Sequence, residues 1–183
     1  MKNPFSDKIL FLQVKSKDHE AYGRFYDLYV DKVYRFVFFK VNSVEDAKDL
    51  TSEVFLKTWQ YIKDDKKIKN LNAFIYMVAR NCVIDFYRNR AKKNENEEFV
   101  SETHFNIIDK DNIAKRIGND LEMSQIVKAL SQLKNEYREA IILHYLDELS
   151  VKEIAQILDK TPGAVRVLVF RALNALKEAT NQK

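Results

Sequence analysis

Residues 149–176 constrain the fold more than any other stretch of this sequence, because the starts of two consecutive helices are visible in them. Ser150 is followed three residues later by Glu153, the spacing of a capping box at a helix N-terminus. Thr161 and Pro162 form a second start signal, since threonine is a good cap and proline is tolerated in the first turn. The sequence therefore predicts two helices joined by a tight turn.

The second of these helices has two different faces. At about 3.6 residues per turn, one side is apolar and faces a core. That side carries Val165, Val169, Ala172 and Leu176, and the opposite side carries Gly163, Arg166, Val167, Phe170, Arg171 and Asn174. Arginines bind guanine or phosphate, a small residue lets the helix start approach a DNA backbone, and an exposed aromatic ring needs a partner. A helix-turn-helix that reads DNA is one interpretation, and an ordinary helical hairpin with a solvated basic face is the other.

Composition favours a nearly all-helical chain of one medium or two small domains. Only 3 glycines and 2 prolines occur in 183 residues. Residues 1–90 carry 17 basic and 12 acidic side chains (+5), residues 91–120 carry 5 and 7 (−2), and residues 121–183 carry 9 and 8 (+1). Two positive parts thus flank a negative connector, a distribution that favours a nucleic-acid partner.

Several classes of site are missing from the sequence. The single cysteine, Cys82, excludes an internal disulfide and fits a reducing compartment, and its apolar surroundings predict a packed core thiol. The three histidines lack metal-ligand spacing, and neither a glycine-rich phosphate loop nor a catalytic triad pattern occurs. No apolar run reaches the roughly 20 residues of a membrane span or resembles a signal peptide. We expect a soluble cytoplasmic protein without catalytic residues, metal or cofactor.

Helical periodicity divides the remaining chain into further amphipathic helices. We expect them at about residues 6–14, 18–41, 44–62, 70–93, 121–133 and 135–149. The inner face of the second is rich in aromatic residues: Tyr22, Phe25, Tyr26, Tyr29, Val33, Phe36 and Val37. The inner face of the third comprises Ala47, Leu50, Val54, Thr58 and Ile62, and that of the fourth Leu71, Phe74, Ile75, Val78, Cys82 and Phe86.

An acidic row lies on the helix expected at residues 44–62. Glu45, Asp49 and Glu53 follow at four-residue steps, with Asp46 beside them. Acidic residues in the first turn are stabilised by the helix dipole. Beyond the first turn that benefit is lost, and like charges one turn apart repel each other slightly. The row therefore suggests a basic protein partner, and a solvated surface is the alternative.

A basic edge lies on the helix expected at residues 70–93, next to a lysine-rich loop at residues 63–70. Its members are Arg80, Asn81, Tyr87, Arg88, Arg90, Lys92 and Lys93. Cations that follow phosphates, together with a ring and an amide that meet unstacked bases, suit single-stranded nucleic acid. The alternative is a basic last turn that favours the helix dipole.

The order of these parts resembles the extracytoplasmic-function (ECF) group of the sigma-70 family of bacterial RNA polymerase sigma factors. VEDAKDLTSEVFLKTW (residues 44–59) resembles region 2.2, and LNAFIYMVARNCVIDFYRNR (residues 71–90) resembles regions 2.3 and 2.4. LSQLKNEYREAIILHYLDELSVKEIAQILDKTPGAVRVLVFRALNALK (residues 130–177) resembles region 4. The resemblance covers most of residues 18–180 and implies two small all-α domains. These are a region 2 domain (residues 1–93) and a region 4 helix-turn-helix domain (residues 121–183), joined by a flexible acidic linker (residues 94–120).

The resemblance also implies a role for each surface. The region 2.2 helix would dock on the clamp of core RNA polymerase through Asp46, Asp49, Leu50 and Glu53. The next loop and helix would melt and hold the −10 element as a single strand through Lys66, Lys67, Lys69, Asn72, Arg80, Asn81, Asp85, Arg88 and Arg90. Region 4 would read the −35 element as duplex through Thr161, Gly163, Arg166, Val167, Phe170 and Arg171.

The resemblance implies a non-catalytic polymerase subunit that selects promoters, with an anti-sigma factor as a further partner. Two positions depart from the family pattern: Leu168 stands where many relatives carry a basic residue, and Asp159 replaces the usual glycine of the turn. Aspartate tolerates left-handed backbone, so the turn itself is retained. The competing hypotheses are a stand-alone helix-turn-helix regulator, which would need neither the acidic row nor the basic edge, and a helical enzyme.

Overall fold

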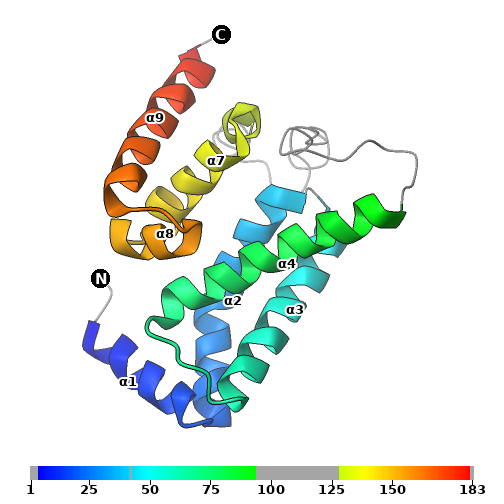
Figure 1. Cartoon of the computed structure of the whole chain (residues 1–183), viewed down its shortest axis with the longest axis vertical. Helices are drawn as coiled ribbons and strands as arrows, with labels where there is room; N and C mark the ends of the chain where they lie inside the picture. The colour runs from blue at the N-terminus through cyan, green and yellow to red at the C-terminus, as the bar shows by residue number, and fades with distance from the viewer. Residues whose placement is uncertain (1–3, 42, 94–127, 182–183) are drawn as a thin grey trace.

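The computed structural model describes residues 4–41, 43–93 and 128–181, and all regular elements within them are helical (Figure 1). The N-terminal half consists of α1 (Pro4–Lys15), α2 (His19–Val41), α3 (Val44–Lys63) and α4 (Leu71–Lys93). The C-terminal half consists of helical residues 128–132, α7 (Asn135–Ile141), the π-helix η2 (Ile142–Leu146), α8 (Val151–Leu158) and α9 (Pro162–Asn181). The all-α prediction is confirmed. The predicted linker, residues 94–120, lies outside the described residues.

Polar caps fix the starts of the helices in the N-terminal half. Asp18, Ser43 and Asn70 each accept a hydrogen bond from a backbone N–H in the first turn of α2, α3 and α4, respectively. Each cap supplies a partner for an N–H group that has none within the helix. The helix starts predicted near residues 18, 44 and 70 follow from these side chains.

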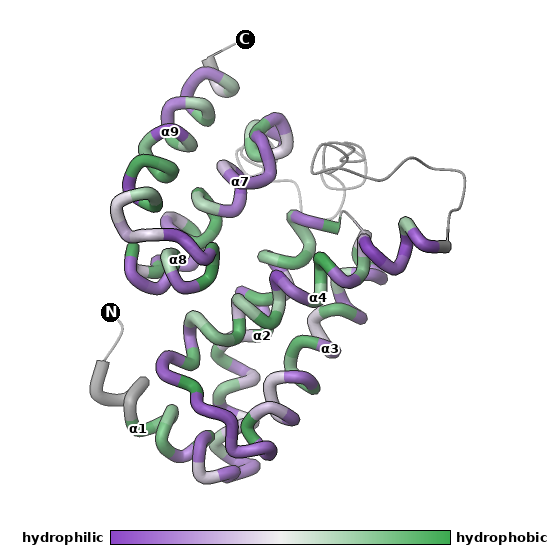
Figure 2. The backbone as a smooth tube through the Cα atoms, viewed as in Figure 1, coloured by the Kyte–Doolittle hydropathy of each residue, from purple (hydrophilic) through white to green (hydrophobic). Residues whose placement is uncertain are grey.

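The core of the N-terminal half lies between α2, α3 and α4. Hydrophobic and hydrophilic residues alternate along these helices (Figure 2), and the predicted inner faces of α3 and α4 are buried or half-buried. One prediction for α2 is wrong, because Tyr26 is 42% exposed. It lies at the edge of the buried face next to Phe25, and its ring contacts Phe55 with centroids 4.6 Å apart.

The helix-turn-helix predicted at residues 149–176 is present as α8 and α9. Ser150 and Glu153 form a complete capping box at the start of α8. Asp159 ends α8 with a left-handed backbone (φ 52°, ψ 49°), as its tolerance of that conformation predicts. The Thr161 hydroxyl accepts a hydrogen bond, 3.2 Å long, from the N–H of Ala164 at the start of α9.

The helix predicted at residues 135–149 ends earlier than expected. It changes to a π-helix at Ile142 and stops at Leu146, where the N–H of Asp147 bonds the carbonyl of Ile142 over 2.9 Å. The Asp147 side chain is buried against Arg35 of α2. The helix therefore ends at the contact between the two halves.

The two halves pack together, with α8 against the N-terminal end of α4 (Figure 1). Their buried apolar side chains form one continuous cluster. Arg138 of α7 also donates a hydrogen bond, 3.2 Å long, to the carbonyl of Phe39 near the end of α2. Among the described residues, no helix combines the length and the apolar character needed to cross a membrane.

Candidate nucleic-acid interface

The outward face of α9 is fully open. All six residues predicted to point away from the core are exposed, and the two apolar side chains among them, Val167 and Phe170, are 49% and 65% exposed. Leu168, one of the two predicted departures from the family pattern, is only 7% exposed and packs in the core, so it lies on the inner side of α9. Gly163 has no neighbouring atom closer than 4.0 Å to the place of a Cβ, which leaves the helix start accessible.

A groove of about 300 Å³ runs between α3 and α4. Its lining combines carboxylates, an apolar floor and one cation: Asp46, Leu50, Glu53, Cys82, Asp85, Phe86, Asn89 and Arg90. Three of the four residues predicted to bind polymerase therefore share this groove, and Asp49 is exposed on the same helix. Asp85 and Arg90, which were predicted to bind the −10 strand, lie here beside the acidic row.

A lysine of α3 partly neutralises the negative charge of the groove, and the thiol of the groove is neutral. Lys57 pairs with Glu53 at 2.7 Å, and this hydrogen bond raises the pKa of Lys57. Burial raises the pKa of the Cys82 thiol to about 11, so the sulfur is a neutral, packed group, as the sequence predicts. The carboxylates of Asp46, Glu53 and Asp85, rather than the cysteine, give the groove its chemistry.

An outward stripe on α4 carries Asn81 and Arg88, both exposed. Met77 and Ile84 complete this stripe at helical spacing and are 39% and 37% exposed. Neither apolar residue was predicted to belong to the site, although both fall outside the inward apolar pattern of α4. The stripe therefore offers an amide, a cation and apolar surface to a ligand.

The loop between α3 and α4 exposes Lys66, Lys67 and Lys69. Ile68 is only 7% exposed and anchors the loop to the core. The ammonium group of Lys66 lies 4.8 Å from the centroid of the Tyr61 ring. The lysines thus lie on a loop held in place from beneath.

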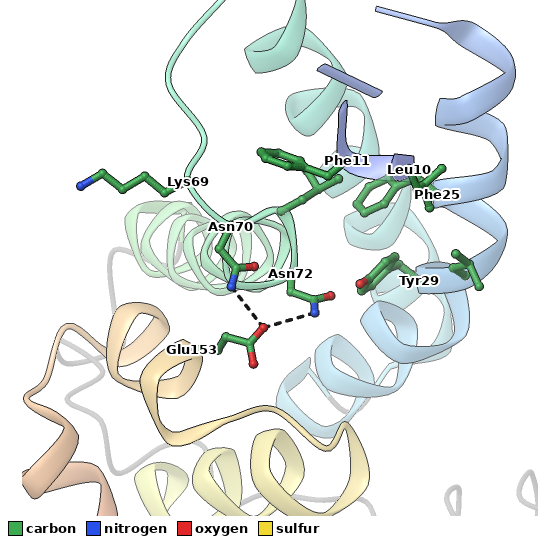
Figure 3. A pocket seen from close by; sticks show the side chains of 10 residues that line it. Leu10, Phe11, Phe25, Tyr29, Lys69, Asn70, Asn72 and Glu153 are labelled. Carbon is green, nitrogen blue, oxygen red and sulfur yellow. Dashed lines mark hydrogen bonds between the residues drawn. The ribbon is translucent and has the colours of Figure 1, made fainter. Parts of the chain in front are cut away.

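Two predicted −10 residues, Asn72 and Arg80, contact the C-terminal half, and Figure 3 shows Asn72 beside Glu153. The Asn72 amide donates to a carboxylate oxygen of Glu153 on α8 over 3.2 Å, and Nε of Arg80 lies 3.5 Å from the carboxylate of Glu139 on α7. Asn72 and Glu153 also line a pocket of about 300 Å³ whose apolar side comes from α1 and α2. The structure does not bring these two residues together with Asn81 and Arg88.

No group of three or more His, Cys, Asp or Glu residues in the described ranges could hold a metal ion.

Comparison with known proteins assigns the family. The sequence profile of Sigma-70 region 2 matches residues 25–93, and that of Sigma-70, region 4 matches residues 123–176. The chain belongs to the sigma-70 family. Within it, the chain is an ECF sigma factor with region 2 and region 4 domains.

Curated relatives and solved structures agree with this assignment. This sigma factor is 27% identical to the ECF sigma factor SigW of Bacillus subtilis, covering 91% of this chain and 92% of SigW. It is 27% identical to the ECF sigma-E factor of Escherichia coli, covering 96% and 95%. It is 28% identical to BldN of Streptomyces coelicolor over 90% of this chain, and spans 62% of BldN.

In fold, the sigma factor is similar to CnrH in its complex with the cytosolic domain of CnrY, with a TM-score of 0.69 and 21% identity over 94% of this chain and 95% of CnrH. It is also similar to RpoE in its complex with the anti-sigma factor NepR from Bartonella quintana. That match has a TM-score of 0.67 and 22% identity over 88% of this chain and 97% of RpoE.

Proposed function

We propose that this ECF sigma factor directs RNA polymerase to promoters through three separate surfaces. The α3–α4 groove binds core polymerase, the α4 stripe with the lysine loop holds the −10 strand, and the outward face of α9 reads the −35 duplex. The observation that carries the proposal is the face of α9, where Phe170 is 65% exposed and lies on the same side as Arg166 and Arg171. An exposed aromatic ring flanked by arginines can contact bases in a DNA major groove, whereas without a partner it would lower the solubility of the protein.

The acidic groove fits a basic, amphipathic helix of the polymerase. Carboxylates of Asp46, Glu53 and Asp85 surround the apolar surface of Leu50 and Phe86. Apolar contact supplies affinity, while the surrounding carboxylates select a cationic partner and speed its encounter. Asp85 belongs to this surface by its position, and we assign it to polymerase binding rather than to DNA binding.

The α4 stripe and the adjoining lysines fit a single strand. Unstacking a base costs a few kcal/mol, which contacts to the base and its phosphate must recover. Arg88 and the three loop lysines supply cations, Asn81 supplies hydrogen bonds, and Met77 and Ile84 supply apolar surface. Sigma factors are non-catalytic, so the polymerase forms the phosphodiester bonds after the strands have separated.

An anti-sigma factor is a further proposed partner, supported by the fold similarity to RpoE in its complex with the anti-sigma factor NepR. We place the protein in the cytoplasm, where the polymerase and the chromosome are.

Run-off transcription tests the proposal. Core polymerase is supplied with the full chain and a pool of promoter fragments from its own genome, and transcripts that depend on the chain are mapped. Asp49→Arg, which reverses a charge beside the groove, should abolish core binding and transcription. Arg166→Ala should leave core binding intact and reduce transcription about tenfold or more, because one good base contact contributes about 1–3 kcal/mol.

Two matched variants control for charge alone. Asp27→Arg and Lys15→Ala change exposed charges on α2 and α1, outside all three surfaces, and should transcribe like the wild type. A chain that binds duplex DNA without joining core polymerase or redirecting initiation would instead be a stand-alone regulator.

A further inference from the structure

Three carboxylates of the C-terminal half point into the N-terminal half. Glu139 on α7, Asp147 after η2 and Glu153 on α8 each contact polar side chains of α2 or α4. Their partners are Lys40 and Arg80 for Glu139, Arg35 for Asp147, and Asn70 and Asn72 for Glu153. In these three contacts the C-terminal half supplies the carboxylates, and the N-terminal half supplies the cations and amides.

The contact of Glu153 is the most exposed of the three and involves a predicted DNA-binding residue. The amides of Asn70 and Asn72 both donate to one carboxylate oxygen, each over 3.2 Å (Figure 3). Burial alone would raise the pKa of Glu153, but hydrogen bonds from Ser150, Asn70 and Asn72 together lower it. The ionised carboxylate of Glu153 therefore accepts a hydrogen bond from the amide of Asn72 and occupies it.

The contact of Glu139 is buried. Glu139 and Lys40 are each 3% exposed, and their charged atoms lie 3.1 Å apart. Burial lowers the pKa of Lys40, and the charge of Glu139 partly restores it. A buried charge persists only with a well-placed partner, so this pair fixes one arrangement of the two halves. Arg80 lies at the rim of the pair, 3.5 Å from the same carboxylate oxygen.

We propose that the carboxylates of Glu139 and Glu153 act as an intramolecular substitute for the −10 strand, occupying Arg80 and Asn72 until the two halves separate. This inference rests on the proposed function and extends its −10 surface to Asn72 and Arg80, the two residues that the family resemblance assigns to the strand and that the interface covers here. A carboxylate presents anionic acceptor oxygens as a phosphate does, so the same cation and amide serve both. The outward face of α9 is exposed in the same closed arrangement, so closing blocks the −10 strand and leaves the −35 duplex accessible.

Fluorescence anisotropy of the full chain without polymerase tests this mechanism with two probes, a −10 single strand and a −35 duplex taken from a promoter mapped by run-off transcription. Glu139→Gln/Glu153→Gln should bind the single strand about tenfold more tightly than the wild type, since charge-assisted hydrogen bonds become neutral ones. The duplex affinity should stay unchanged. Glu153→Gln alone, which keeps a residue able to complete the capping box, should show a smaller gain in the same direction.

Glu136→Gln is the matched control. It removes a carboxylate from the same helix, but Glu136 pairs with Lys160 of its own half at 2.9 Å, so both affinities should match the wild type. Equal single-strand affinity in the wild type and both interface variants would overturn the intramolecular block and leave the proposed function standing. A parallel gain for the duplex would also overturn it, as an unspecific charge effect. Absence of single-strand binding in every variant and in the holoenzyme would instead refute the proposed function.

Discussion

Arg138 is the residue whose burial most needs an explanation, because it is 1% exposed and charged. Its guanidinium donates to four backbone carbonyls, those of Leu130 (2.9 Å), Phe39 (3.2 Å), Ser131 and Leu133 (3.1 Å each). We expect Arg138→Met to lower the free energy of unfolding by about 3 kcal/mol, since it leaves buried carbonyls without donors. Urea unfolding followed by circular dichroism measures the change. Arg138→Lys should rescue little, because an ammonium cannot span four acceptors.

Arg166→Met provides the comparison for Arg138. It makes the same chemical change at an exposed position on α9 and should shift the free energy of unfolding by no more than about 0.5 kcal/mol. Equal losses in the two variants would mean that Arg138 contributes nothing specific through its carbonyl contacts.

Cys82 gives a prediction about pH. Its folded pKa, about 11, exceeds the value of about 8.5 for a free thiol. The neutral thiol therefore contributes stability that is fully present below the unfolded pKa and is lost as pH rises through about 11. At pH 8 a thiol reagent should modify the native chain more than about 100-fold more slowly than the urea-unfolded chain. Modification at equal rates would show that the groove floor opens in the native state.

The turn between α8 and α9 is the element whose geometry depends most on one residue. Asp159 has a left-handed backbone, which costs a residue with a Cβ about 1 kcal/mol and glycine almost nothing. Asp159→Gly should raise the free energy of unfolding by about 0.5–1 kcal/mol and leave affinity for the −35 duplex unchanged. Lys160→Gly, at the next position and without a positive φ, should lower stability instead. Thermal unfolding of both variants checks the opposite signs.

The helices and the outward face of α9 could be predicted because their signals act within a few residues. Ser150, Glu153 and Thr161 cap helices in the structure as the sequence indicates. The same locality limits prediction for α4, where Asn81 faces solvent and Arg80, the residue before it, faces Glu139. Which side of a helix meets another domain depends on contacts between residues far apart in the sequence, and no local spacing records them.

The molecule as a whole should unfold as one unit, because the apolar core continues across both halves and two ion pairs join them, one of them buried on both sides. The single tryptophan, Trp59, lies in α3 against Tyr22 and reports only on the N-terminal half. Its fluorescence and the circular dichroism of all helices should therefore give the same urea midpoint in the wild type. Glu139→Gln/Glu153→Gln weakens the contact between the halves, so its two midpoints should separate. Separate midpoints already in the wild type would show that the two halves are energetically independent, and closing could then exclude a promoter strand only weakly.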